Sequence, residues 1–172
     1  GIAFGTKDGG SQWAQQDTQV AWDIADIDFT DAMNGWAVGS TGLAMRTNDG
    51  GASWEALYTY TVYDLNSVYF VNNKKGWAVG SYGIILTTDD GGDTWYSQRC
   101  HSYANLNKVY FADANRGWIV GDSGAIFVTN NGGETWNPLS LPTRANLYDI
   151  KKAADGSLWI TGEWGTVIKG EV

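Results

Sequence analysis

Tryptophan recurs along this chain at a constant interval, and that interval constrains the fold more than any other feature. Two sets of four tryptophans run through the sequence, and the members of each set are 41 residues apart. The first set is Trp13, Trp54, Trp95 and Trp136, and the second is Trp36, Trp77, Trp118 and Trp159. A fixed period of this length predicts a repeat architecture.

A short box ends at each tryptophan of the first set, and its third copy, residues 88–95, reads TDDGGDTW. Its glycines can supply positive φ for a tight turn, and its aspartate can accept hydrogen bonds from the backbone of the same turn. The tryptophan ring can fill the gap between neighbouring repeats. We interpret the box as a structural hairpin staple without a metal, because calcium needs more convergent oxygens. Its structural residues are Asp8, Trp13, Asp49, Trp54, Asp90, Trp95, Asn131 and Trp136.

Each period contains four short strand-like runs separated by turn signals. Where they are clearest, these runs cover residues 65–71, 76–81, 83–88 and 94–100, and we name the four positions A, B, C and D. No window of ten residues carries a helical period. A four-stranded antiparallel unit repeated every 40 to 45 residues or so is typical of a β-propeller blade. The sequence therefore predicts an all-β propeller domain with about four blades present and helix content close to nil.

The repeat boundaries place both ends of the chain inside a blade. We predict a partial repeat at 1–22, complete repeats at 23–63, 64–104 and 105–145, and a partial repeat at 146–172. This division gives seventeen strands, whereas a closed four-bladed ring needs sixteen. Three alternatives follow: a segment of a longer propeller, a four-bladed ring with one redundant strand, or self-assembly in which another chain completes the last blade and covers its edge.

Composition excludes several classes of function. The formal net charge is −8, which opposes binding to nucleic acid or to an anionic membrane surface. The single cysteine, Cys100, excludes an internal disulfide, and with the single histidine, His101, it leaves too few soft ligands for zinc. No apolar run approaches the roughly 18 to 20 residues that cross a bilayer. We therefore predict no metal, no cofactor, no nucleic acid partner and no membrane insertion.

The box pattern T-x-D-x-G-x-[ST]-W resembles the Asp-box, or BNR repeat, of sialidase-like propellers. With GWAVG at 35–39 and 76–80 and GWIVG at 117–121, the whole period resembles the photosystem II stability and assembly factor family. The resemblance implies the fold, but it spans glycosidases, sorting receptors, assembly factors and structural modules, so it does not select a function. Related repeats occur in secreted bacterial proteins, and we expect an extracellular or periplasmic location.

The connections from D to A and from B to C share one face of a propeller. The sequences of these loops differ between copies, whereas the boxes do not. This variation indicates that the fold does not constrain the loop residues, which are therefore available for binding. Aromatic rings edged by polar groups are typical of peptide-binding and sugar-binding surfaces. Alternatively, some of these rings cap the core or meet neighbouring blades. The candidate ligand-binding residues are Trp22, Tyr60, Tyr63, Tyr82, Tyr103 and Trp164.

Three further sets of polar positions recur with the repeat. One precedes each A strand, which predicts a turn role, and the other two lie on the A strands, where we expect one set to line a polar channel. The set before the A strands is Asp23, Asp64, Asn105 and Asn146. The first set on the A strands is Asp26, Ser67, Lys108 and Asp149, and the second is Asp28, Tyr69, Tyr110 and Lys151.

An enzyme of the sialidase-like class needs three arginines to hold the substrate carboxylate, together with a tyrosine–glutamate pair and an acid/base residue. The chain has only four arginines, and two of them, Arg46 and Arg116, lie away from the loop face. A glycosidase that uses two carboxylates could draw on Asp26, Asp122, Asp149 or Glu163. Adjacent Cys100 and His101 on a strand would point to opposite faces, which excludes a catalytic dyad.

We therefore predict no catalytic residue. The predicted function is a non-catalytic binding or structural module that presents its loop face to a protein or a surface glycan, as part of a larger extracytoplasmic protein or assembly. The alternative is a glycoside hydrolase of the sialidase-like propeller class.

Overall fold

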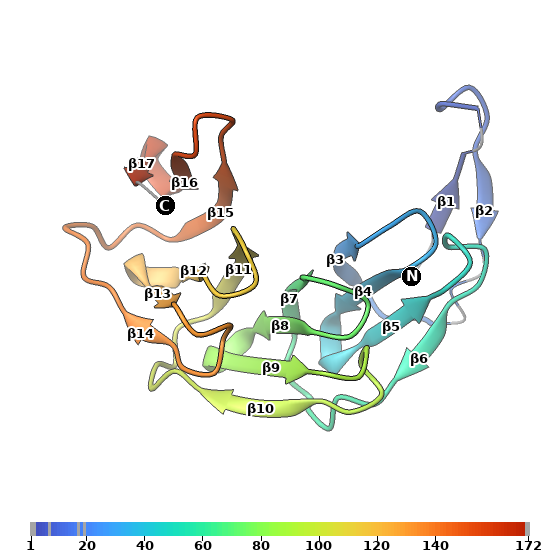
Figure 1. Ribbon diagram of the computed structural model, residues 1–172, viewed down its shortest axis with the longest axis horizontal. Helices are drawn as coiled ribbons and strands as arrows, with labels where there is room; N and C mark the ends of the chain where they lie inside the picture. The colour runs from blue at the N-terminus through green and yellow to red at the C-terminus, as the bar shows by residue number, and fades with distance from the viewer. Residues whose placement is uncertain (1–2, 7, 17, 19, 171–172) are drawn as a thin grey trace.

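The computed structural model describes residues 3–6, 8–16, 18 and 20–170. These residues form seventeen strands in five antiparallel sheets (Figure 1). Within each sheet the strands are hydrogen-bonded in sequence order, so every sheet is a meander. The structure thus confirms the predicted all-β fold of four-stranded blades.

The sheets follow the predicted repeats. The first contains only β1 (Ala3–Gly5) and β2 (Ala14–Gln16), in the C and D positions. The three complete blades contain β3 (Ile24–Phe29), β4 (Gly35–Gly39), β5 (Ala44–Thr47), β6 (Glu55–Leu57); β7 (Leu65–Phe70), β8 (Gly76–Gly80), β9 (Ile84–Thr88), β10 (Tyr96–Arg99); and β11 (Leu106–Phe111), β12 (Gly117–Gly121), β13 (Ile126–Thr129), β14 (Asn137–Pro138). The last sheet contains β15 (Leu147–Lys152), β16 (Leu158–Gly162) and β17 (Val167–Gly170), in the A, B and C positions.

The turns between B and C strands differ from the plain turns that we expected. Each is one turn of 3₁₀ helix whose middle residue has positive φ, for example 57° at Tyr82. The carbonyl of the first residue accepts the N–H of the residue after the turn, which closes it tightly. These turns are η1 (Ser40–Gly42), η2 (Ser81–Gly83), η3 (Asp122–Gly124) and η4 (Glu163–Gly165).

The blades follow one another around an arc with the A strands on its inner side (Figure 1). Contacts join β3 to β7, β7 to β11, and β11 to β15. The sheet of β1 and β2 and the sheet of β15 to β17 lie at opposite ends of the arc, which is open between them. The alternative of a closed four-bladed ring is therefore not the arrangement of this chain.

The core lies between the blades and is built on aromatic stacking. Trp36 of β4 stacks on Phe70 of the next blade with ring centroids 3.7 Å apart, and Trp95 meets the same phenylalanine edge-on at 6.0 Å. The next interface repeats this arrangement with Trp77 on Phe111 at 3.9 Å. Trp36 and Trp77 therefore pack their blades against the following ones, and the box tryptophans Trp95 and Trp136 meet the same phenylalanines edge-on.

The glycine that opens β4, β8 and β12 has a packing role. A Cβ atom at Gly76 would lie 2.6 Å from the ring of Phe70 on the neighbouring β7. Only a residue without a side chain leaves room for this ring, on which Trp36 of the preceding blade stacks. In the GW pair, Gly76 thus packs on Phe70 of its own blade, while Trp77 stacks on Phe111 of the next blade.

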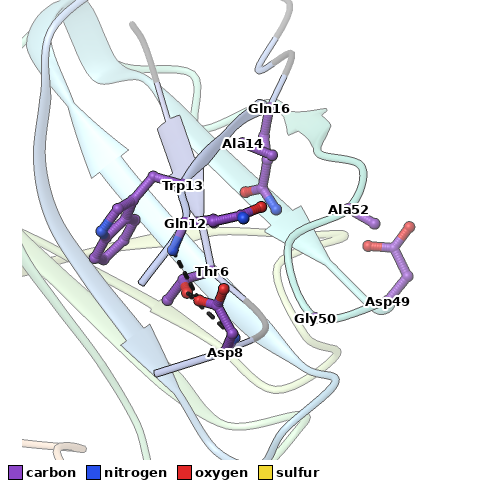
Figure 2. Close-up of a pocket in the computed structure, with 10 residues that line it drawn as sticks. Thr6, Asp8, Gln12, Trp13, Ala14, Gln16, Asp49, Gly50 and Ala52 are labelled. Carbon is purple, nitrogen blue, oxygen red and sulfur yellow. Dashed lines mark hydrogen bonds between the residues drawn. The ribbon is translucent and has the colours of Figure 1, made fainter. Parts of the chain in front are cut away.

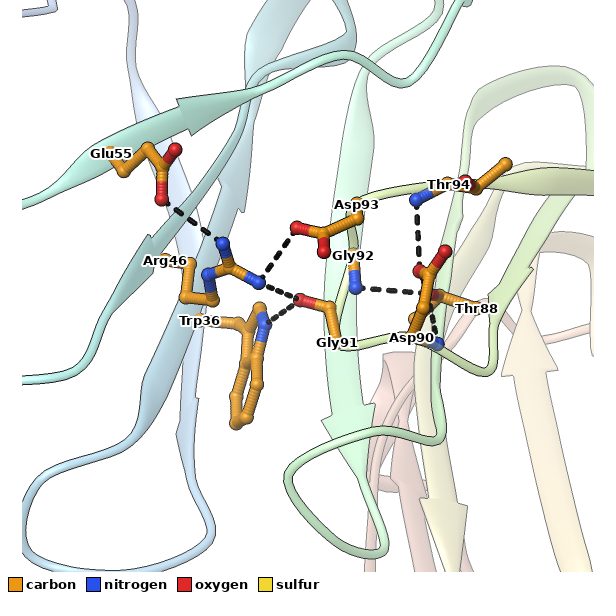
Figure 3. A network of polar contacts seen from close by, with 9 residues as sticks. All are labelled: Trp36, Arg46, Glu55, Thr88, Asp90, Gly91, Gly92, Asp93 and Thr94. Carbon is orange, nitrogen blue, oxygen red and sulfur yellow. Dashed lines mark hydrogen bonds and ion pairs between the residues drawn. The ribbon is translucent and has the colours of Figure 1, made fainter.

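The boxes are held by hydrogen bonds within their own turns (Figure 3). In the third box, Thr88 Oγ1 donates to Asp90 Oδ1 at 2.8 Å, and the Thr94 N–H donates to the same oxygen at 2.8 Å. The Gly92 N–H donates to Thr88 Oγ1 at 2.9 Å. The same three bonds recur in the boxes of Asp8, Asp49 and Asn131.

A glycine carbonyl of the box anchors the preceding blade. The Gly91 carbonyl accepts Trp36 Nε1–H at 2.8 Å and Arg46 Nη1–H at 3.3 Å, as Figure 3 shows. Arg46 also pairs with Asp93 at 2.9 Å and with Glu55 at 3.0 Å. At the next interface Gln98 Nε2 donates to the Gly133 carbonyl at 2.8 Å. The boxes therefore hold neighbouring blades together as well as their own hairpins.

We predict that the box tryptophan stabilises the blade interface in proportion to its burial. Trp95 is 6% exposed, and Trp95→Ala should lower the free energy of unfolding by about 3 to 5 kcal/mol because it leaves a cavity beside Phe70. Trp13 is 61% exposed, so Trp13→Ala should cost less than about 1 kcal/mol. Urea unfolding followed by circular dichroism measures both, and equal costs would contradict this packing.

We also predict acid sensitivity from the second box. Hydrogen bonds from the Ser53 side chain, then the Ser53 backbone, lower the pKa of Asp49 from 3.8 to about 2. A depressed pKa in the folded state stabilises the fold above the unfolded value and loses that contribution as the pH falls from about 4 toward 2. Asp49→Asn should therefore reduce the slope of stability against pH in that window. Urea midpoints at pH 5, 3 and 2 measure the slope, and an unchanged slope in Asp49→Asn would contradict the prediction.

Candidate binding face

The B–C turns and the D–A loops form one face, as the sequence predicted. The Gly124 N–H of η3 donates to the Ala145 carbonyl at the end of the same blade's loop, at 2.9 Å. At Gly83 of η2 the approach is so close that a Cβ atom would lie 2.0 Å from the Ser102 carbonyl oxygen. The loop of each blade is thus fixed against that blade's own turn.

The polar residue ahead of each A strand fixes the turn of the preceding blade. Asp64 Oδ1 accepts the N–H of Thr41 at 2.8 Å, and Asn105 Oδ1 accepts that of Tyr82 at 3.3 Å. Asn146 does the same for Ser123 at 2.8 Å. These bonds confirm the predicted turn role and stabilise the residue that has positive φ. Because the backbone of Tyr82 is fixed in this way, its side chain projects from the face, and it is 64% exposed.

A first groove lies on this face beside η1 and has a volume of about 460 Å³. Trp22 borders it together with the D–A loop of the same blade, in which Tyr58 and Tyr60 lie with ring centroids 6.5 Å apart. Tyr60 is 90% exposed and has a φ of 55°. Among the described residues, the lining is Val20, Trp22, residues 41–44 and residues 56–61.

A second groove occupies the equivalent place in the next blade, beside η2, with a volume of about 600 Å³. Tyr63 and Tyr82 stand 41 positions after Trp22 and Thr41, and their ring centroids are 5.1 Å apart. Tyr103 lies at the far end of the lining and is 88% exposed. The complete lining is Tyr63, residues 82–84 and residues 97–103.

A buried side chain forms the floor of each groove. Thr59 Oγ1 donates to the Gly42 carbonyl at 2.7 Å, and Cys100 Sγ donates to the Gly83 carbonyl at 3.4 Å from the equivalent position. Cys100 is 5% exposed, whereas the neighbouring His101 is exposed on the groove with a φ of 57°. The cysteine therefore has a structural contact, and the pair is not a dyad. Sequence reasoning missed this contact, although Thr59 and Cys100 lie one period apart.

The structure divides the six predicted binding residues among three places. Trp22 and Tyr60 line the first groove, and Tyr63, Tyr82 and Tyr103 line the second. Trp164 is 86% exposed on η4 of the last blade and belongs to neither groove. Arg99 and His101 line the second groove as well. Sequence reasoning placed both residues in a D–A loop of this face but chose only the aromatic residues as candidates for binding.

The inner A strands carry a separate polar network. Asp26 Oδ2 accepts Ser67 Oγ–H at 2.7 Å and pairs with Lys108 Nζ at 2.8 Å, so it bridges three successive blades. Asp28 Oδ2 accepts the Phe70 N–H at 2.6 Å, and burial raises the pKa of Asp28. Members of both predicted A-strand sets therefore bond to the neighbouring A strand, and the lining of a channel by one set stays a prediction. Their contacts are those of a structural network.

Two other candidate carboxylates, Asp122 and Glu163, are also engaged. Asp122 accepts Nδ2–H bonds from Asn105 at 3.0 Å and Asn107 at 2.9 Å. Glu163 accepts the Tyr148 hydroxyl at 3.0 Å, and this bond raises the pKa of Tyr148. Within the described ranges, no group of three or more His, Cys, Asp or Glu side chains is placed to hold a metal ion.

A further cavity of about 420 Å³ lies between the first two boxes (Figure 2). Gly5 on its wall stands one period before Arg46, which contacts the next box across the following interface. Asp8 faces the cavity, but its Oδ1 accepts bonds from Thr6 at 2.8 Å and from the Gln12 N–H at 2.9 Å. Because Gly5 stands where the next repeat has Arg46, no long side chain fills this space. We therefore attribute the cavity to that substitution within the repeat and not to a ligand site.

The arc of four-stranded meanders with Asp-box turns and grooved loops defines a β-propeller of the Asp-box class. The family model described as photosynthesis system II assembly factor YCF48 matches residues 6–103 and 96–171, so the chain belongs to this family. No curated protein sequence matches it significantly. In the part of the chain that the structure describes, no helix is long and apolar enough to span a membrane.

Solved structures of the same family resemble the chain. YCF48 bound to D1 peptide is 26% identical, with a TM-score of 0.73 over 90% of this chain and 53% of that one. YCF48 from Cyanidioschyzon merolae is 25% identical, with a TM-score of 0.74 over 92% of this chain and 56% of that one. The chain thus spans about half the length of these relatives. A GH74 enzyme from Niastella koreensis, 13% identical with a TM-score of 0.68 over 85% of this chain and 28% of that one, shares the fold alone.

We predict that Gly83 is indispensable for the shape of the second groove. Gly83→Ala places a Cβ 2.0 Å from a backbone carbonyl at a φ of 72°, so it should cost about 3 kcal/mol or more. Gly165→Ala is the matched control, because φ is 71° there and nothing lies within 4 Å. Its cost should be about 1 to 2 kcal/mol, the penalty for the left-handed conformation alone. Urea unfolding compares the two, and equal costs would contradict the close approach.

Proposed function

We propose that the chain is a non-catalytic propeller module that binds a peptide segment of a partner protein on its loop face. The observation that supports this most directly is the pair of equivalent aromatic grooves on adjacent blades. Tyrosine and tryptophan side chains give a large contact area for little loss of conformational freedom, and they dominate binding energy at protein interfaces. A YCF48 relative was solved bound to D1 peptide, which supports a peptide as the class of ligand.

The absence of catalysis is part of this proposal. Arg46 and Arg116 are engaged in ion pairs with Glu55, Asp93 and Asp113, away from the grooves. Asp26, Asp122 and Glu163 accept hydrogen bonds from neighbouring strands and loops, which gives each a structural role. These contacts weaken the case for a sialidase-like or two-carboxylate glycosidase.

We also infer that the module acts outside the cytoplasm, as part of a larger protein or assembly. Resemblance to repeats of secreted bacterial proteins motivates this location. Fractionation of the source cells with antibody detection tests it, and recovery in the cytoplasm alone would contradict it.

Selection from a random peptide library tests the proposed binding. Peptides enriched on the wild-type chain should bind Tyr82→Ser roughly 30-fold more weakly, because removal of a central interface aromatic costs about 2 kcal/mol. Tyr96→Ser is the matched control, since Tyr96 is 58% exposed on β10 but lines neither groove. No enrichment, or equal losses in both variants, would contradict the proposal, and retention on a glycan array instead would indicate a carbohydrate partner.

A further inference from the structure

The two grooves are parts of one track. Thr61 lines the first groove and Tyr63 lines the second, and only Val62 separates them in the chain. Two residues of fully extended chain span at most about 7 Å, so these lining residues are close neighbours. Val62 is 80% exposed and stands between the grooves. A single extended peptide of roughly six to nine residues, about 20 to 30 Å long, is long enough to contact both.

The two ends of the track differ in charge. The second groove carries Arg99 and His101, and no Asp or Glu is among its described lining residues. The ion pairs found in the described ranges involve neither of these two residues. The chain has a net charge of −8, but no acidic residue of the described lining lies beside Arg99 and His101. The exposed Arg99 therefore makes this groove a local cationic site. It is complementary to a carboxylate.

The first groove has the opposite bias. Its described lining contains no charged side chain and presents Trp22, Tyr58 and Tyr60. Asp64 lies where the two grooves adjoin: its Oδ1 accepts the Thr41 N–H of η1 at 2.8 Å, and its backbone carbonyl accepts the Ser81 N–H of η2 at 2.9 Å. The carboxylate of Asp64 is bonded to η1, so it would repel an acidic side chain of the ligand beside it in the first groove. The first groove therefore disfavours an acidic side chain and suits an apolar one.

We propose that one extended peptide binds across both grooves, with an aromatic or aliphatic side chain in the first and an acidic side chain in the second. This inference rests on the proposed function and adds the chemistry and polarity of the ligand. Arg99 pairs with the carboxylate, and Tyr63 and Tyr82 contact the segment between the two anchors. Because one backbone links the anchors, the second contact forms at a high effective concentration. The two-part peptide therefore binds at least roughly tenfold more tightly than either part alone.

Three synthetic nonapeptides with blocked ends test this inference. The first has a Leu-Phe pair near one end and a Glu pair near the other, the second replaces the Glu pair by Gln, and the third replaces the apolar pair by Ser. Each is also made in reversed order, which allows for either chain direction. Titration into labelled protein is followed by NMR through the backbone amides of residues 56–61 and 97–103.

The first peptide should shift amides of both grooves in at least one orientation and bind roughly tenfold more tightly than either of the others. Arg99→Gln should reduce its affinity to that of the Gln peptide and leave the Gln peptide unaffected. Arg144→Gln is the matched control, because Arg144 is exposed on another D–A loop and lines neither groove. Higher salt should narrow the difference between the Glu and Gln peptides.

Two kinds of result would overturn the inference, one against the charge assignment and one against the track, and the experiment distinguishes them. If Glu and Gln peptides bind equally and shift both grooves, or if Arg99→Gln weakens both equally, the charge assignment is wrong while peptide binding stands. If no peptide shifts either groove, the track is wrong, and the library selection then decides whether peptide binding on this face is wrong too.

Discussion

The stack of Trp36 on Phe70, closed on its other side by Trp95, is the interaction on which the rest of the structure depends. Each four-stranded sheet is a thin layer, and it becomes stable only when its faces are covered by neighbouring blades. The stack links the B strand of one blade to the A strand and box of the next. The blade angle, and therefore the spacing of the loops, follows from these three rings.

Polar contacts then fix the orientation of each blade relative to the next. The Gly91 carbonyl receives Trp36 and Arg46 on the box side, and Asp64 receives the Thr41 N–H on the loop side. Each blade is thus bonded to the next at both ends of its sheet. The grooves lie on a framework that is fixed from two sides, so the backbone that carries their aromatic side chains is in place before a ligand binds, which lowers the entropic cost of binding.

The 41-residue period was sufficient to predict the blades, the boxes and the face that carries the variable loops, because each depends on residues that recur. The grooves could not be predicted in the same way. Whether Tyr63 and Tyr82 share a groove depends on the positive φ at Tyr82 and on its bond to Asn105, which belongs to the next repeat. Arg99 was not among the predicted binding residues, since its proximity to Tyr63 depends on the folded loop.

The scaffold and the binding face use different columns of the repeat, and this division explains how one blade differs from the next. The column that holds Trp22 and Tyr63 continues with Ala104 and Ala145, and the column that holds Thr41 and Tyr82 continues with Ser123 and Trp164. Apart from the contact of Tyr63 with Tyr82, the ring contacts found between the described blades do not involve these positions. Exposed side chains in these columns can therefore change without loss of an interblade stack, whereas the buried Ala145 leaves no room for a larger residue. The aromatic pair of Tyr63 and Tyr82, which comes from two successive repeats, can therefore occur at one place along the chain, while the box, which holds two blades together, keeps its pattern.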